Sequence, residues 1–267
     1  MQTYFLIAAT LLYLVCAFLP SRKAVPVAAL TAGAWLLHGA ALWINVMVPG
    51  SLRIGFAAML SSALWISVAA YWLENQNYPL EGLRRIVMPV AAATTVLQAI
   101  FPGNLLPVDG RTAVLGWHIA IATLAYATLT IAAFHAVLMA LQESRLHSNS
   151  DCTTFLSTAL DQLPALLTME KLLFRLIAFG FTLLSLTVLS GIVFSEELFG
   201  RALKWDHKSV FTLLSWMLFA SLLAGRHFRG WRGRTALTFT LAGFATLLLA
   251  YVGSRFVLEV VLHRGIA

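Results

Sequence analysis

The feature that most constrains this chain is a succession of long apolar runs separated by short polar connections. A helix needs roughly 20 mostly apolar residues to cross the hydrocarbon core of a membrane, where the backbone must satisfy its own hydrogen bonds. Eight runs meet or approach this length, at about residues 3–19, 25–48, 54–73, 86–102, 112–141, 173–195, 208–224 and 236–258. The fourth run is short and contains Pro89. The sequence predicts an all-α, polytopic integral membrane protein with about eight transmembrane helices.

The composition agrees with this prediction. Of the 267 residues, 60% are hydrophobic and 11% are charged, whereas soluble domains carry about 25% charged residues. The longest connection, about residues 142–172, is too short for a soluble domain, and its FLSTALDQLPALLTM stretch is expected to lie on the membrane surface. We therefore predict a single transmembrane domain over residues 1–267. The formal net charge of +7 comes from Lys and Arg between the apolar runs, which indicates topology signals and lipid contacts rather than nucleic-acid binding.

The basic residues also predict an orientation, because cytoplasmic connections carry an excess of Lys and Arg. Arg22 and Lys23 follow the first run and no charge precedes it, which is the reverse of the order in a signal peptide. We interpret this run as a retained span with its N-terminus outside. The inner connections then hold eleven Lys and Arg residues and the outer ones seven. This predicts extracytoplasmic N- and C-termini and a multi-pass location in the bacterial inner (plasma) membrane.

The motifs of several enzyme and transporter classes are missing. Cys16 and Cys152 form no CxxC pair, which weighs against thiol exchange and against a cysteine metal site. The chain has no GxSxG, HExxH or Walker lysine loop. Its apolar runs hold few acidic residues to relay protons or bind cations, which weighs against an ion-coupled transporter.

The predicted topology places three histidines on the outer side, namely His118, His207 and His263. Two neutral imidazoles on opposite faces of a macrocycle can hold haem iron, and nearby tryptophans such as Trp117 and Trp205 can supply flat apolar contact. The same tryptophans are equally typical of the aromatic belt at a membrane surface. From these residues alone, both interpretations stay open.

Other polar positions have two interpretations as well. His38 lies near mid-membrane and is either a ligand or a hydrogen-bond partner of a neighbouring helix. The Arg-rich GWRGR, residues 230–234, is either a cytoplasmic anchor or a contact for a propionate or a partner. His135 lies 17 residues beyond His118, about 25 Å along a helix, so the two cannot bind the same ligand.

Three stretches in the second half of the chain resemble a known family. In LKWDHKSVFTLLSW, residues 203–216, Trp205, Asp206 and Lys208 stand at the W-D-x-K positions of a tryptophan-rich signature that reads approximately W-x-W-D-P-K-E. GWHIAIATLAYATL and GWRGRTALTFTLAGFATLLLAYVGSRF resemble two further spans of the same family. The chain is similar to the cytochrome c assembly family of CcsA/HemX-like haem-handling membrane proteins, closest to the short, eight-span YpjD-like subgroup. The similarity covers about residues 112–267 and is weak over the first four spans.

This resemblance implies site residues. His118 takes the place of the first outer haem-ligating histidine of the family, and His263 lies at about the place of the second. His227 is the nearest match to a histidine that binds haem within the membrane in some members. The signature itself departs from the family, because His207 replaces its Pro, Ser209 replaces its Glu and the preceding aromatic-rich stretch is reduced. These departures weigh against haem-ligase activity more than against haem binding.

The sequence therefore predicts a protein that binds, moves or senses haem of b type, without bond-breaking chemistry of its own. His118 would be an axial ligand and His207 or His263 its partner. The candidate cofactor-binding residues are His118, His207, His263, Trp205, Asp206, Lys208, His227 and Trp117. The expected partners are membrane lipid and other cytochrome c assembly or membrane proteins. The alternatives are a non-catalytic membrane partner or regulatory subunit that kept the scaffold, and a small-solute transporter.

Overall fold

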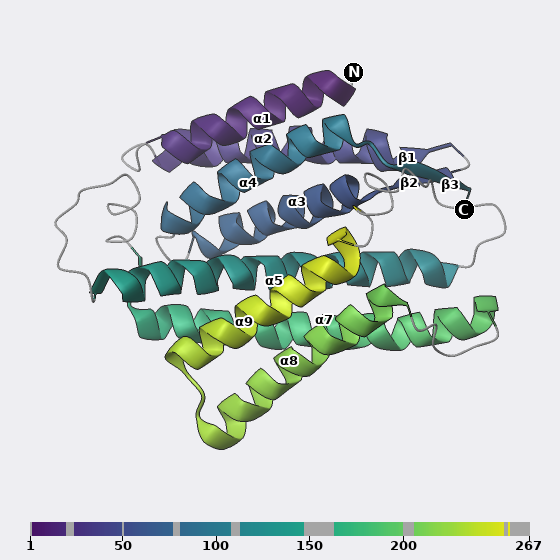
Figure 1. Ribbon diagram of the computed structural model, residues 1–267. Coiled ribbons are helices and arrows are strands. Elements are labelled where there is room, and N and C mark those ends of the chain that lie inside the picture. Colours follow the sequence, from purple (N-terminus) through teal and green to yellow (C-terminus); the bar gives the residue numbers. More distant parts are fainter. Residues whose placement is uncertain are drawn as a thin grey trace.

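The computed structural model describes residues 2–19, 24–49, 51–76, 81–107, 113–146, 163–199, 206–253 and 256 as a bundle of helices (Figure 1). In these ranges, 7 helices are long and apolar enough to cross a membrane, and the first helix is a shorter apolar one. The helices are α1 (Gln2–Phe18), α2 (Ala24–Val46), α3 (Phe56–Glu74), α4 (Glu81–Ile100), α5 (Ala113–Leu146), α7 (Leu166–Phe199), α8 (His207–Arg229) and α9 (Gly233–Leu248), which continues as a short π-helix, η2 (Leu249–Gly253). Each of the eight predicted spans corresponds to one helix, so the predicted all-α polytopic fold is confirmed.

Several helix ends differ from the apolar runs that predicted them. α5 continues to Leu146 and α7 already begins at Leu166, because the flanking polar residues are good helix formers and project beyond the apolar layer. α4 begins at Glu81 and contains Pro89. In membrane helices, neighbouring groups can satisfy the backbone carbonyl that a proline leaves without its donor. Most of the predicted surface segment lies outside the described residues, and its last residues form the start of α7.

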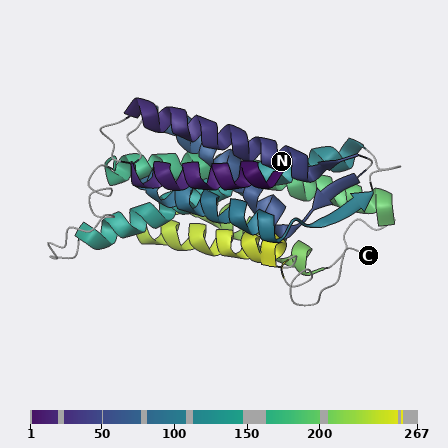
Figure 2. The same ribbon diagram turned by 90° about the horizontal axis from the view of Figure 1, so that it is seen from above.

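A small antiparallel sheet, which the hydropathy pattern did not predict, lies at one end of the bundle (Figures 1 and 2). Its strands are β1 (Met47–Val48), β2 (Ser51–Ile54) and β3 (Asn104–Pro107), in the order β1-β2-β3. These strands are too short to show a period of two residues in the sequence. Gly103 precedes β3 with φ 89, and a Cβ there would lie 2.9 Å from the backbone of Ile54, so this turn requires glycine.

The helices are arranged in two groups that meet at α3 and α5. Figure 1 shows α1, α2 and α4 on one side, α3 and α5 in the middle, and α7, α8 and α9 on the other side. α5 and α7 pack along much of their length, and α8 and α9 form a helical hairpin against them. One continuous cluster of buried residues, rich in alanine, runs through both groups. Small side chains allow helix backbones to approach closely in a membrane.

The arrangement places several helix ends together. The start of α1, the N-terminal ends of α5 and α8 and the C-terminal end of α7 lie at the end of the bundle that carries the sheet (Figure 1). His118 and His207 therefore lie at the same end of the molecule, in agreement with the topology used to group them. The side of the membrane to which this end faces stays a prediction.

Candidate functional site

His118 lies near the beginning of α5 and faces α7. Its ring is half-buried, and Nδ1 is 2.9 Å from the Oγ of Ser190 on α7. A Cβ at the neighbouring Gly191 would lie 3.4 Å from His118 Cε1. The imidazole therefore lies close against the surface of α7. Trp117, the preceding residue, points away from the bundle and is 71% exposed.

The W-D-x-K stretch forms the beginning of α8. Asp206 is the N-cap residue, and its Oδ1 accepts hydrogen bonds from Ser209 N at 2.8 Å and from Ser209 Oγ at 2.9 Å. Such a carboxylate satisfies a backbone N–H that has no partner inside the helix. His207 is exposed and Lys208 is half-buried. The Ser209 that replaces the family's Glu thus completes the cap. The roles of Asp206 in orienting His207 or binding a propionate stay predictions.

The structure brings together only part of the predicted set. His227 lies exposed in the last turn of α8, with its ring centroid 4.9 Å from that of Phe228. It is 20 residues from His207, about 30 Å along the helix, so His227 cannot bind the same ligand as the residues at the other end. Trp205 and His263 lie outside the described residues. Within the ranges described above, no group of three or more His, Cys, Asp or Glu side chains is close enough to hold a metal ion.

His118 has the surroundings that suit a haem ligand. Ligating histidines usually donate their other ring N–H to a second group, which holds the ring in place, and Ser190 can serve in that way. His207 at the start of α8 offers a second imidazole at this end of the bundle. The donor chemistry therefore fits iron held by two imidazoles.

Sequence reasoning missed the residues that α7 contributes. Ser190 contacts His118, and Ser185 Oγ accepts a hydrogen bond from Nε1 of Trp216 at 2.8 Å. A serine inside an apolar run shows no periodic signal, and its partner is set by how two helices pack. Trp216 is thereby tied to α7 and also packs against Phe181.

His38 is fully buried and forms hydrogen bonds with two neighbouring helices. Its Nδ1 is 3.2 Å from Tyr13 Oη on α1, and its Nε2 is 2.7 Å from Ser61 Oγ on α3. Beside it, Trp35 and Trp65 stack at 4.7 Å, and the Nε1 of each donates to the backbone carbonyl of the other. Both ring nitrogens of His38 have partners in the bundle. Of the two interpretations of His38, the structure shows the hydrogen-bonded one.

The GWRGR stretch joins α8 to α9 and is held by Glu170 of α7. Arg226 Nη1 donates to Glu170 Oε1 at 2.6 Å and to the carbonyl oxygen of Trp231 at 3.3 Å. Arg232 Nε lies 3.4 Å from the same carboxylate oxygen. Two of the basic residues here are therefore paired within the chain. The sequence indicated an anchor at this place but did not identify Glu170 as its acidic partner.

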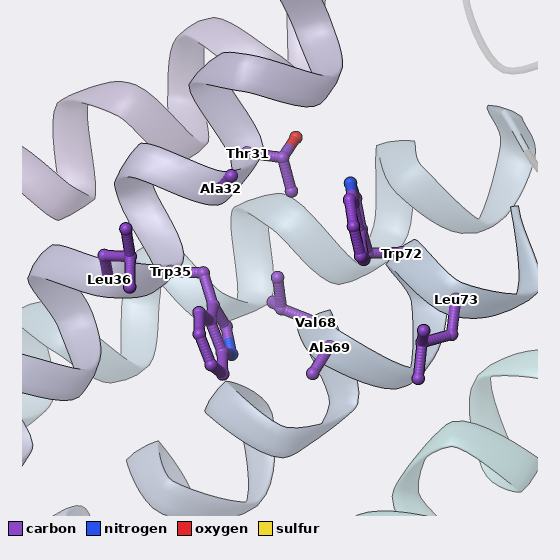
Figure 3. A pocket seen from close by; sticks show the side chains of 8 residues that line it. All are labelled: Thr31, Ala32, Trp35, Leu36, Val68, Ala69, Trp72 and Leu73. Carbon is purple, nitrogen blue, oxygen red and sulfur yellow. The ribbon is translucent and has the colours of Figure 1, made fainter. Parts of the chain in front are cut away.

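An apolar groove of about 300 Å³ lies between α2 and α3, on the outer surface of the bundle (Figure 3). Trp35 and Trp72 line it, and the partly exposed Leu36 and Leu73 form its rim. None of its lining residues is a histidine, cysteine or carboxylate. The groove therefore offers no ligand to a metal and suits apolar contact with the membrane.

Comparison with known proteins extends the resemblance over almost the whole chain. The family model described as Cytochrome C assembly protein matches residues 4–262, which includes the first four spans. The inner membrane protein YpjD of Escherichia coli (strain K12) is 30% identical over 176 residues, which cover 66% of this chain and 64% of that protein. The match therefore spans somewhat less than two thirds of the length of this relative.

Two relatives carry the name cytochrome c biogenesis protein CcsA. The protein from Guillardia theta is 29% identical over 262 aligned residues, covering 80% of this chain and 87% of the relative. The one from Gloeobacter violaceus is 33% identical over 110 residues, covering 41% of this chain and 32% of the relative. No solved structure matches. The predicted multi-pass inner-membrane location agrees with the membrane-capable helices and with the E. coli relative. With a family match over residues 4–262 and this helical membrane fold, the chain belongs to the cytochrome c assembly protein family.

Proposed function

We propose that this protein handles haem in the inner membrane and holds it at the end of the bundle where α5, α7 and α8 begin or end. The observation that supports this most directly is the half-buried imidazole of His118, held against α7 by Ser190 in a chain of the cytochrome c assembly family. His118 is the proposed axial ligand. The second axial ligand is His207 or His263. The chain would act in cytochrome c assembly together with other membrane proteins.

The residues around His118 have complementary roles in this proposal. The indole of Trp117, which is exposed, would lie along the flat face of the haem ring. The indole of Trp205 would have the same role. Lys208 can form a charge-assisted hydrogen bond with a propionate. Asp206 holds the start of α8, and so the position of His207, through its cap on Ser209. When bound, haem supplies any redox chemistry, and the chain binds and orients it.

The proposal is tested by purifying the full chain in detergent from haem-replete membranes and recording the reduced absorption spectrum and the haem-to-protein ratio. We expect about one haem per protein, and we expect His118→Ala to remove most of it, because coordination by the imidazole is lost. His147→Ala, which the topology places on the inner side, is the matched control. Of His207→Ala and His263→Ala, only the variant of the true second ligand should shift the spectrum.

A wild-type protein that carries no haem and cannot be loaded with it would overturn the proposal. That result would favour a non-catalytic membrane partner that kept the family scaffold.

A further inference from the structure

Ser190 of α7 contacts one ring nitrogen of His118. The Oγ of Ser190 lies 2.9 Å from His118 Nδ1 and donates its own proton to the backbone carbonyl oxygen of Thr187 at 3.1 Å. A carbonyl oxygen can only accept, and a hydroxyl group carries one proton. When that proton is directed to Thr187, the Oγ of Ser190 accepts the hydrogen bond from His118. The hydrogen of the neutral imidazole is therefore on Nδ1.

The tautomer decides which nitrogen can bind a metal. In a neutral imidazole with its hydrogen on Nδ1, the lone pair lies on Nε2. We infer that Ser190 is a positioning residue for the proposed haem ligand, because it fixes His118 as the Nδ1–H tautomer and so makes Nε2 the coordinating atom. This inference rests on the proposed function and adds a residue of α7 that no family motif named above contains.

The packing around the His118 imidazole restricts its orientation together with the hydrogen bond to Ser190. His118 is half-buried between α5 and α7, and the Cβ position of Gly191 lies 3.4 Å from its Cε1. The ring is therefore in van der Waals reach of α7 beside the hydrogen bond. A ring held on one edge by α7 and by a hydrogen bond has few orientations left, which favours a ligand over a freely rotating side chain.

The tautomer can be measured without haem. The full chain, labelled with ¹⁵N in its histidine rings and prepared haem-free in detergent micelles, is studied by nuclear magnetic resonance, and His118 is identified by the signals that His118→Ala removes. We expect a protonated Nδ1 and an unprotonated Nε2 at a pH where the ring is neutral. In Ser190→Ala, the population with hydrogen on Nε2 should rise. A wild-type His118 with its hydrogen on Nε2 would overturn the inference.

Haem binding provides the second measurement. Ser190→Ala should weaken the affinity for haem by about tenfold or more, as is typical when the group that orients a ligating histidine is removed. It should also shift the absorption spectrum. Ser190→Thr keeps the hydroxyl group and should restore the wild-type behaviour. Thr187→Ala is the matched control, because it removes a half-buried hydroxyl that bonds to its own helix, while the carbonyl that accepts from Ser190 remains.

Different results would contradict the proposed function and the proposed role of Ser190. If the wild type binds no haem, the proposed function fails. If haem binds and depends on His118, but Ser190→Ala changes neither affinity nor spectrum, then only the role of Ser190 is wrong.

Discussion

His38, His118 and His135 lie in membrane-spanning helices, and their surroundings differ. His38 has Tyr13 on one nitrogen and Ser61 on the other, so it joins three helices. His135 has the carbonyl of Ile131 at Nδ1 and the carboxylate of Glu74 at 3.3 Å from Nε2. His118 lies at a helix end, where its ring is only half-buried. At the scale of single residues, burial and hydrogen-bond partners therefore distinguish the two structural histidines, His38 and His135, from the candidate ligand His118.

We expect His38→Leu to lower the free energy of unfolding by about 1–3 kcal/mol, because the buried hydroxyl groups of Tyr13 and Ser61 lose their partner. The measurement is thermal unfolding of the purified chain in detergent, followed by tryptophan fluorescence. His227→Ala, at an exposed position, should change stability by less than about 0.5 kcal/mol. Equal effects of the two substitutions would show that the hydrogen bonds of His38 do not stabilise the bundle.

At the scale of elements, the α8–α9 hairpin depends on close packing at its turn. α8 ends at Gly230, whose φ of 65 is the left-handed conformation that glycine adopts without strain. Trp231 then folds back over Gly225, where a Cβ would clash with the indole ring. Arg226 donates to the carbonyl of Trp231 and to Glu170, which ties the turn to α7. The basic stretch at the α8–α9 turn therefore forms a specific contact with α7, in addition to its predicted role as a topology signal.

The substitution Gly225→Ala should destabilise the protein by about 1–3 kcal/mol, because the added methyl group must displace the Trp231 ring. Gly33→Ala makes the same chemical change in α2, where nothing lies within 4 Å of the new Cβ. That control should be neutral or slightly stabilising, since alanine favours a helix more than glycine does. Both variants are compared by their midpoints of thermal unfolding. A stable Gly225→Ala protein would contradict the close packing of Trp231.

At the scale of the whole molecule, the contact between α3 and α5 joins the two groups of helices. Ser67 Oγ on α3 lies 3.2 Å from the carbonyl oxygen of Ala127 on α5. Further along the same pair, His135 and Glu74 face each other, and the imidazole is fully buried. Polar contacts of this kind hold helices together where the lipid provides no hydrophobic driving force between them. If residues 1–267 form a single domain, as predicted, the contact between α3 and α5 must hold the two groups of helices together.

Glu74→Ala tests the contact, because it leaves the buried His135 imidazole without its acidic partner. We expect a loss of about 1–3 kcal/mol in stability and faster amide hydrogen exchange in the facing ends of α3 and α5. Exchange in the α8–α9 hairpin should stay unchanged. Faster exchange spread evenly over all helices would show that this pair does not join the two groups locally.

Much of the fold could be predicted because a membrane imposes one rule on every residue of a span. An apolar run of sufficient length must be a helix, since a lipid-exposed backbone has no other way to satisfy its hydrogen bonds. The run that contains Pro89 also forms a helix, α4. The sheet of β1, β2 and β3 escaped prediction because its strands are short and because β2 and β3 pair over a long sequence separation. Helix ends were misplaced where polar residues continued the helix past the apolar layer.

The sequence by itself determined the helical, polytopic membrane fold, the family and the histidines worth testing, because hydropathy and motif spacing are properties of residues along the chain. Only the tertiary structure decided that His38 bonds to Tyr13 and Ser61 and that His118 rests on Ser190. The physical reason is that a side chain's partner depends on how two helices are rotated and how far they are shifted against each other. Those quantities arise from packing, in which small residues such as Gly180 of α7, where a Cβ would clash with Leu129 of α5, allow an approach that no spacing in the sequence reveals.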